Sequence, residues 1–153
     1  MLNIQSTGRR KMSLKFTISN STGESLCRTP QSLRLRLQNT PLEEKEALLF
    51  MLYLNKVKGI EVFRDTRIFF SSRRTKRRWG TCWAEENLVV LYRHVVQTLL
   101  HELAHVPFGH QEGHGPQFAR FLDTLVILWE GEEWKEFRGT LLRKEPKENA
   151  QEK

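Results

Sequence analysis

The 153-residue sequence predicts one α+β domain in which a small antiparallel sheet lies between helices along the chain. Two observations carry this prediction. Between residues 60 and 92, β-branched and aromatic residues cluster in short runs separated by turn-forming residues, as is typical of strands. Before and after that region, apolar residues recur at helical spacing. A content of 39% hydrophobic and 10% aromatic residues suffices for one hydrophobic core, so disorder is not expected.

Residues 1–29 are rich in Ser, Thr and Asn and carry a basic excess, so we expect a polar basic N-terminal arm with one edge strand at Leu14–Ile18. Residues 30–143 form the predicted domain, and residues 144–153 a charged C-terminal tail. In SLRLRLQ, residues 32–38, the leucines fit both a strand at period two and a helical face. The pattern leaves these two alternatives open.

An N-terminal helix is predicted from Pro41 to Lys58. Thr40 is a suitable N-cap, Pro41 suits the first helical position, and two glutamates follow in the first turn. Gly59 is expected to end the helix. The apolar residues of this helix should form one wall of the core: Leu42, Leu48, Leu49, Phe50, Met51 and Leu52.

The strands of the expected sheet are IEVF, RIFFSS, RRWGTCWA and NLVVLY, which begin at residues 60, 67, 77 and 87. Turns are expected at residues 64–66 and 85–87. Helical patterns follow in HVVQTLLHELAHV from residue 94, PQFARFLDTLVILW from residue 116 and EEWKEFRGTLLRK from residue 132. Proline and glycine residues separate these three helices.

Composition restricts location and cysteine chemistry. No apolar run approaches the ~20 residues needed to cross a bilayer, and the N-terminus lacks the apolar stretch of a secretory signal. We therefore expect a cytoplasmic monomer with no membrane contact. The two cysteines, Cys27 and Cys82, lie far apart without CxxC pairing, so neither a disulfide framework nor a cysteine-rich zinc ribbon is expected.

Positive charge is concentrated in the first half of the chain. Residues 1–80 hold 17 Lys and Arg against 6 Asp and Glu, a net charge of +11, whereas residues 81–153 hold 8 against 12, a net charge of −4. The densest basic stretch, RRTKRR at residues 73–78, fits a solvated strand edge that resists aggregation, and equally fits contact with DNA. The candidate nucleic-acid-binding residues are Arg73, Arg74, Lys76, Arg77 and Arg78.

The segment HELAH, residues 101–105, has the HExxH pattern of a metal site. Successive helical residues are rotated by about 100°, so His101 and His105 lie about 40° apart on one face and can reach one ion. Glu102 lies about 100° from His101, which suits a general base acting on metal-bound water better than a ligand. The opposite face is apolar and should be buried: Val96, Leu99, Leu100, Leu103 and Val106.

A catalytic zinc site usually has three protein ligands and one position for water. The downstream candidates for the third ligand are His110, Glu112, His114 and Asp123. His110 follows the helix end too closely for the chain to reverse direction, whereas His114 directly precedes Gly115-Pro116, where a new helix begins. We therefore favour His114, with His110 in a loop near the site and His94 as a packing residue. Imidazole ligands suit zinc and also other transition metals.

Three motifs follow one another in order: RRWGTC at residues 77–82, HELAH at 101–105 and GHGPQF at 113–118. Together they resemble the SprT-like zinc metallopeptidases and the related YgjP-like group. The resemblance covers about Arg73 to Phe121, a third of the chain.

The resemblance implies a compact zincin-like α+β domain with one zinc ion per chain, bound by His101, His105 and His114. It implies that Glu102 is the catalytic carboxylate, and it supports His114 because an aromatic residue, Phe118, follows four positions later. In Spartan-type relatives the substrate is protein crosslinked to DNA, which implies a protein substrate and a role for DNA. The cysteine zinc ribbon of many SprT proteins is not found in this sequence.

Other classes remain as alternatives. HELAH with His110 five residues later also resembles the repressor-cleaving ImmA and IrrE peptidases, whose third ligand is a glutamate in a later helix; PQFARFLDTLVILW has none at that place. A metal-dependent hydrolase with a non-peptide substrate would have the same site. A nucleic-acid-binding protein with a purely structural zinc site would have no use for Glu102 as a base.

The strand that contains Trp79–Cys82 could align an extended substrate by backbone pairing. Trp79 and Trp83 are interpreted as core or sheet-face aromatics rather than catalytic residues. Gly80 indicates either a bulge or a place where another part of the chain approaches closely.

Overall fold

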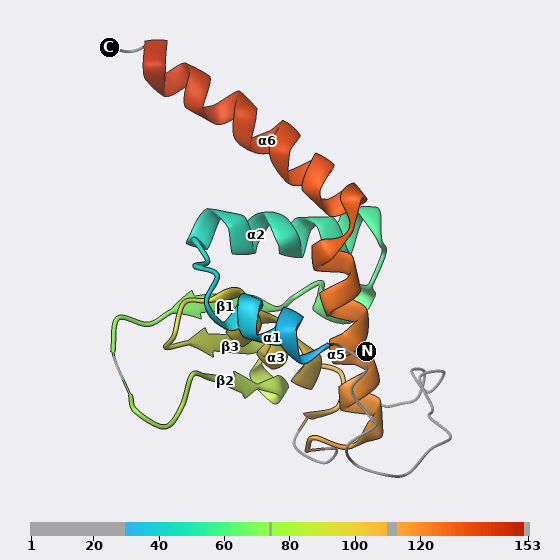
Figure 1. Cartoon of the computed structure of the whole chain (residues 1–153). Helices are drawn as coiled ribbons and strands as arrows, with labels where there is room; N and C mark the ends of the chain where they lie inside the picture. The colour runs from blue at the N-terminus through green and yellow to red at the C-terminus, as the bar shows by residue number, and fades with distance from the viewer. Residues whose placement is uncertain (1–29, 74, 110–112, 152–153) are drawn as a thin grey trace.

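The computed structural model describes residues 30–73, 75–109 and 113–151, with side chains described as far as residue 143. The predicted arm, residues 1–29, lies outside these ranges. Within them, five α-helices and a three-stranded sheet form an α+β fold, as predicted (Figure 1). No helix in the described part of the chain is long and apolar enough to cross a membrane.

The segment SLRLRLQ, which the sequence left undecided between strand and helix, is helical. Helix α1, Gln31–Gln38, buries Leu37 and leaves Leu35 exposed. The Thr40 hydroxyl donates a 2.7 Å hydrogen bond to the Arg36 carbonyl oxygen and so helps to close the C-terminal end of α1.

The predicted start of the second helix at Thr40 and Pro41 is wrong. Helix α2, Glu44–Leu52, begins three residues later, because Pro41 forms an isolated antiparallel bridge with Val95. The amide of Val96 donates to the Thr40 carbonyl, and the amide of Leu42 donates to the His94 carbonyl, both at 3.0 Å. These bonds fasten the α1–α2 link to the segment that leads into the HELAH helix.

Helix α2 continues as a π-helical turn, η3 at Tyr53–Val57, and the chain then leaves the helix at Gly59, where φ is +66°. This stop confirms the prediction, since glycine adopts positive φ without steric cost. Only part of the predicted apolar wall is buried: Leu48 and Leu52 are exposed, while Phe50 packs edge-on against Trp129 and Trp134, each at 4.9 Å between ring centroids.

The sheet is mixed rather than antiparallel, so this part of the prediction is wrong. Its strands are β1, Arg67–Phe70, β2, Gly80–Trp83, and β3, Leu88–Leu91, in the order β1-β3-β2. Strand β3 is parallel to β1 and antiparallel to β2. The chain reverses direction between β1 and β2, and it reverses again between β2 and β3. Strand β3 then lies between the first two strands, so it runs in the same direction as β1 and opposite to β2.

The expected strand IEVF is instead a 3-10 turn, η4 at Glu61–Phe63, that buries the Phe63 ring completely. The turn predicted after β2 is present as a 3-10 turn, η5 at Ala84–Glu86, followed by Asn87 in the left-handed conformation. Asparagine tolerates that conformation better than most residues, which suits a tight hairpin.

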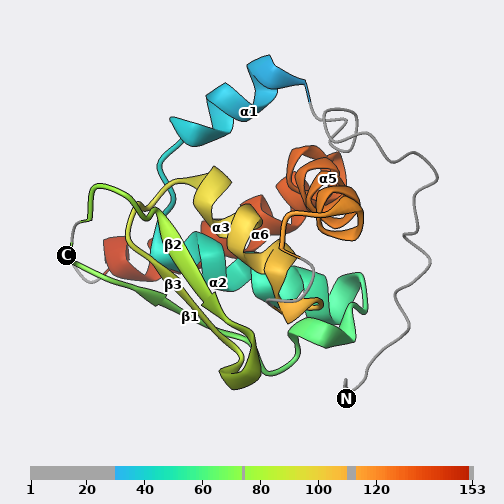
Figure 2. The same cartoon turned by 90° about the horizontal axis from the view of Figure 1, so that it is seen from below.

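Helix α3, Val96–His105, lies beside the sheet and between it and α5, Pro116–Glu130 (Figure 2). As predicted, the apolar face of α3 is buried in the core. Helix α6, Glu132–Gln151, starts with the buried Trp134 and continues through the expected tail, projecting away from the rest of the molecule (Figure 1). Lys and Glu have high helix propensity, which explains why the helix continues into the charged segment that was predicted as a tail.

Candidate metal centre

Helix α3 presents two histidines on the face opposite its buried apolar face. His101 and His105 are both partly buried, and their ring centroids are 5.1 Å apart. The spacing of four residues places both imidazoles on one side of the helix, one turn apart. The apolar residues on the other face anchor α3 against the sheet and α5, so the pair is carried by a rigid element.

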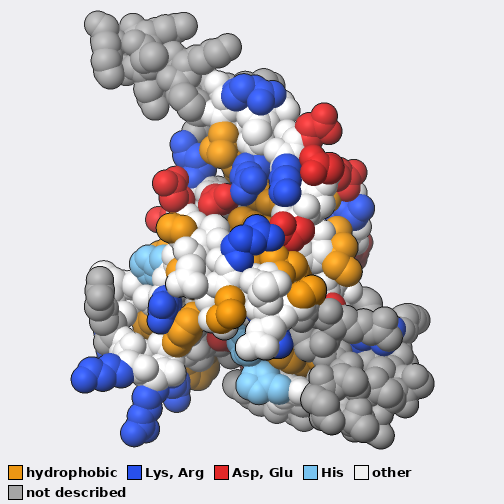
Figure 3. All heavy atoms as spheres, in the orientation of Figure 1, with side chains coloured by type: hydrophobic (Ala, Val, Ile, Leu, Met, Phe, Trp, Pro, Cys, Tyr) orange, Lys and Arg blue, Asp and Glu red, His pale blue; other side chains and the backbone are white. Residues whose placement is uncertain are grey.

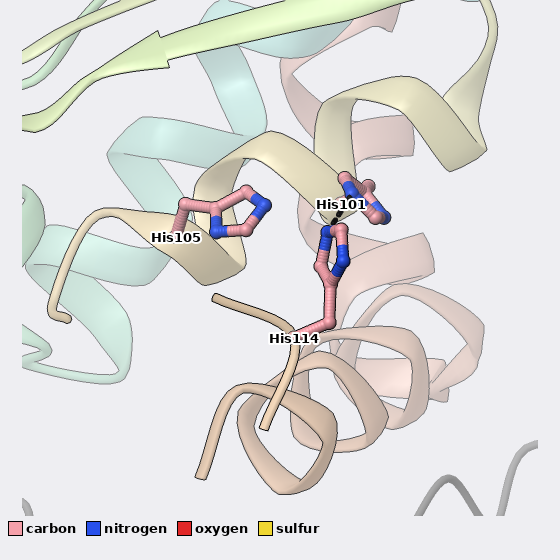
Figure 4. Close-up of side chains that lie close together, drawn as sticks. All are labelled: His101, His105 and His114. Atoms are coloured by element: carbon pink, nitrogen blue, oxygen red, sulfur yellow. Dashed lines mark hydrogen bonds between the residues drawn. The ribbon is translucent and has the colours of Figure 1, made fainter. Parts of the chain in front are cut away.

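The third histidine comes from the link into α5. His114 follows Gly113, whose φ of +61° allows the chain to turn, and precedes Gly115-Pro116, where Pro116 is the first residue of α5. Proline at this position has a φ suited to a helix start. Helix α5 therefore begins directly beside α3 and holds His114 over the histidine pair, as Figure 4 shows.

The structure brings the three predicted histidines together. One ring nitrogen from each of His101, His105 and His114 lies within 4.8 Å of the others, and the Nε2 atoms of His101 and His114 are 3.2 Å apart (Figure 4). The Phe118 ring stacks on His105 at 4.4 Å between centroids and also contacts the other two rings. An apolar ring at this place restricts the orientations that the imidazoles can adopt.

The donor set fits a transition-metal ion. Three imidazoles that converge on one point are suitable ligands for zinc. Burial, assisted by the nearby His114, lowers the pKa of His101 to about 4. The His101 ring is therefore neutral at physiological pH, which is the form that binds metal.

Glu102 is the buried acid beside this group. Its side chain is 7% exposed, and burial raises its pKa to about 7. A carboxyl group with a pKa near neutrality can both accept and release a proton at physiological pH. It is next to His101 in sequence and lines the same cleft as the three histidines.

This pKa predicts how the stability of the metal-free protein depends on pH. The carboxyl of Glu102 ionises near pH 4.5 in the unfolded chain and near pH 7 in the folded one, so the charged form costs stability once pH exceeds 4.5, and the full cost is reached above 7. We expect metal-free Glu102→Gln to unfold at a higher temperature than wild type at pH 8, and the difference to vanish by pH 4.5. Calorimetry of both proteins in the presence of a chelator measures this difference in unfolding temperature. A difference that does not change with pH would contradict the prediction.

Gly80 marks a close approach between β2 and α3. A Cβ atom at this position would lie 2.8 Å from Cγ of Glu102, 2.9 Å from Cγ2 of Thr98 and 3.0 Å from the Val90 carbonyl oxygen. These distances are shorter than van der Waals contact, so only glycine lets the strand pack this closely on the helix. The structure shows the close approach at Gly80. It also shows a bulge directly beside it, because the amides of Tyr92 and Arg93 both donate to the Trp79 carbonyl oxygen.

We expect Gly80→Ala to lower the free energy of unfolding by about 1–3 kcal/mol, as overpacking does. The added methyl must also displace Glu102, so we expect any Glu102-dependent activity to fall about 100-fold. Gly139→Ala is the control, since its nearest contact would be an ordinary 3.5 Å from a flexible Arg143 nitrogen. Thermal unfolding and activity at matched zinc content measure both effects; equal behaviour of the two variants would contradict the close-approach argument.

The histidines and Glu102 line one cleft of about 760 Å³, within the ~300–1,000 Å³ range of ligand-binding clefts. Its walls come from α1, α3, the start of α5, β2 and the segment before β2. Among the lining residues are Arg34 and Gln38 from α1 and Gln97 and Thr98 from α3. Sequence reasoning missed these four, although Gln97 lies four residues before His101 and so on the same helical face.

The predicted basic stretch is divided between two positions. Arg77 and Arg78 line the cleft, whereas Arg73 and Lys76 are exposed and lie outside its lining; Arg74 lies outside the described residues. Figure 3 shows Lys and Arg side chains projecting together at the lower left, where Figure 1 places the loop between β1 and β2.

The remaining sequence candidates lie elsewhere. His94 packs on the Phe70 ring and has its Nε2 2.9 Å from the Ser71 carbonyl oxygen, as expected of a packing histidine. Asp123 lines a separate cavity between α1 and α5. His110 and Glu112 lie outside the described residues. Cys82 is buried, and burial, with a smaller effect of Glu102, raises its pKa to about 12.

The two tryptophans near the site differ in their surroundings. Trp79 lines the cleft and stacks against the Arg93 guanidinium, 3.9 Å from the ring centroid, whereas Trp83 is exposed at the end of β2.

Comparisons of the chain with protein families, curated proteins and solved structures found no match. The arrangement of residues therefore carries the functional argument alone.

Proposed function

We propose that this chain is a zinc-dependent metallopeptidase of the zincin type, similar to the SprT-like peptidases. One observation carries the proposal: three imidazoles and a buried carboxylate with a raised pKa line a single open cleft. Zinc bound by His101, His105 and His114 would supply Lewis acidity, which polarises a peptide carbonyl and makes water a better nucleophile near neutral pH.

Glu102 performs the proton transfers of the proposed reaction. Its carboxylate accepts a proton from the attacking water and then delivers it to the amine that leaves. A pKa near 7 suits both steps, because the group then exchanges protons readily at physiological pH. Gly80 contributes indirectly, since the absence of a Cβ atom leaves room for the Glu102 side chain.

Strand β2 is suited to hold the substrate. In the described sheet it pairs with β3 on one side only, and Gly80, Thr81 and Cys82 line the cleft. An extended peptide can add to such an edge through backbone hydrogen bonds, which recognise a peptide without reading its sequence. This arrangement favours a peptide over a small ester or amide as substrate.

Two alternative readings receive less support. A structural zinc site is normally closed by four protein ligands, whereas the group found among the described residues has three and opens into a large cleft. An ImmA-like or IrrE-like site would take its third ligand from a later helix. Here His114, before α5, stands beside the pair, and Asp123 on α5 lines another cavity.

We also propose that DNA can bring protein substrates to this cleft. Arg73 and Lys76 are exposed on the loop whose following residues, Arg77 and Arg78, line the cleft. A polyanion bound to this loop would lie next to the site.

The test is cleavage of casein, as an unfolded substrate, and of a histone, as a DNA-binding one, each read by intact-mass spectrometry. We expect fragments with one zinc per chain, their loss with a chelator and their return when zinc is restored. Faster histone cleavage in the presence of single-stranded DNA, with casein unchanged, would support DNA as a tether. No fragments from zinc-loaded protein under any condition would overturn the peptidase proposal.

A further inference from the structure

The two faces of the sheet have different surroundings. Gly80 faces α3, and Cys82, two residues later on the same side of β2, is buried. Side chains that alternate with these two point to the opposite side, which we call the outer face. Figure 2 shows α3 and α5 together on one side of the sheet. By strand register the outer face has two rows: Phe69, Val90 and Thr81, and Arg67, Leu88 and Trp83.

The outer face exposes two aromatic rings. Phe69 is 57% exposed and Trp83 is 46% exposed, and they are the two exposed aromatic residues in the described part of the chain. They lie two strands and two residues apart, which corresponds to about 12 Å. The half-buried Leu88 and Val90 lie between them on β3. The result is a flat apolar platform with an aromatic ring near each end.

A basic loop, residues 73–78, adjoins the Phe69 end of this platform. It connects the end of β1 to the start of β2, and its described cations are exposed (Figure 3). The Arg78 amide donates a 3.0 Å hydrogen bond to the Thr75 hydroxyl, which closes the loop into a turn. The cations are therefore held close together beside the aromatic platform, where they attract a polyanion.

Acidic residues lie at the other end of the outer face. Glu85 and Glu86 are exposed in η5, directly after Trp83. Residues 60–95 nevertheless hold 8 Lys and Arg against 4 Asp and Glu, a net charge of +4. A bound polyanion would therefore place its charged groups near the basic loop and only uncharged groups near Trp83.

We propose that the outer face binds single-stranded nucleic acid, with phosphates on the basic loop and bases stacked on Phe69 and Trp83. Aromatic rings beside clustered cations are the combination that binds single strands without reading their sequence. A duplex fits less well, because its bases are already stacked and paired. A bilayer would meet the whole face at once, including Glu85 and Glu86, whereas a thin strand can place its phosphates away from them.

The outer face and the cleft meet at the free edge of β2. Thr81 belongs to the outer face and also lines the cleft, as do Arg77 and Arg78 of the basic loop. A protein attached to a strand on the outer face would therefore lie beside the cleft. The inference rests on the proposed role of DNA and adds to it the form of nucleic acid and the residues that hold the bases.

The test is binding of a labelled twelve-nucleotide oligothymidine to the full-length chain, followed by fluorescence anisotropy at several salt concentrations. The comparison probes are an abasic strand of the same length and a duplex of the same length. Stacking on two rings should make oligothymidine bind at least about tenfold more tightly than the abasic strand. The duplex should also bind more weakly than oligothymidine.

Variants separate stacking from charge. Phe69→Leu and Trp83→Leu keep an apolar side chain, and each should weaken binding about 5- to 100-fold without changing the salt dependence. Phe69→Tyr and Trp83→Phe are the matched controls and should bind nearly as wild type, because each keeps a ring. Arg73→Gln combined with Lys76→Gln should reduce the slope of log affinity against log salt by about 1.4, as two lost phosphate contacts imply.

Four outcomes would overturn the inference. They are equal binding of the abasic strand, tighter binding of the duplex, wild-type binding by both leucine variants, and failure of oligothymidine to bind. Tighter binding to phosphatidylserine vesicles, lost in Phe69→Leu, would assign the face to lipid instead. A dimer in sedimentation that Phe69→Leu dissociates would assign it to a second copy.

Cleavage separates this inference from the peptidase proposal. Zinc-loaded Phe69→Leu should cleave casein as wild type does and should lose only the acceleration of histone cleavage by single-stranded DNA. Unchanged acceleration in this variant would remove the platform from the DNA role. Oligothymidine binding with the expected ring dependence, but without cleavage of any protein, would retain the outer face and remove the peptidase.

Discussion

Glu102→Gln is expected to lose peptide cleavage by about 10²–10⁴-fold, the range for a general acid–base group, while zinc content stays at one ion per chain. Glutamine has nearly the same size and can occupy the same buried place, but its amide cannot accept the proton of the attacking water. The three imidazoles are unchanged, so binding of the ion should be unaffected. The variant thus separates proton transfer from metal binding.

The measurement is the rate of casein fragment formation, with zinc determined on the same samples by atomic emission. Glu85→Gln is the control, because it makes the same chemical change in the exposed turn after β2 and should cleave like wild type. If Glu102→Gln cleaved at the wild-type rate, Glu102 would not be the base. If it lost zinc, the carboxylate would belong to the ligand set.

His114→Ala is expected to reduce zinc affinity by at least about 100-fold, more than the ~10–100-fold lost when a partner of a ligand is removed. Two histidines of α3 would remain, and a pair of imidazoles from one helix leaves the ion with too few protein ligands for a catalytic site. The fold should be kept, since His114 is exposed and its helix α5 is anchored by buried apolar residues further along.

Zinc affinity is measured by competition with a chromophoric chelator, and the fold by far-ultraviolet circular dichroism. His110→Ala is the informative comparison, because His110 is the histidine that competes with His114 for the third position in the sequence. We expect His110→Ala to bind zinc as wild type does. The opposite outcome, with His110→Ala losing zinc and His114→Ala retaining it, would contradict the proposed ligand set.

Much of the candidate site could be predicted because it is local. His101 and His105 lie on one helix, and helical geometry alone sets their spacing and their position opposite the apolar face. His114 could also be predicted, because the Gly115-Pro116 helix start restricts where a residue just before it can lie. Short-range backbone geometry determines all three.

Predictions failed where pairing or packing between distant segments decided the outcome. Thr40-Pro41 has the local features of a helix start, yet backbone bonds to the segment around Val95 place it in a bridge instead. The segments that form β1, β2 and β3 were predicted as strands, but their order and relative directions depend on which strands pair in the folded protein. Residue periodicity indicates which face of a strand is buried and contains no information about which strand lies beside it.

The sequence by itself therefore determined the α+β class, the histidine face of α3 and the acid beside it, because each follows from residue type and helical period. Only the tertiary structure decided that the sheet is mixed, that Gly80 makes room for Glu102, and that Arg34 of α1 lines the same cleft as Gln97 and Thr98 of α3. The reason is physical: α1, β2 and α3 are far apart along the chain, and burial of their common core brings their polar side chains together.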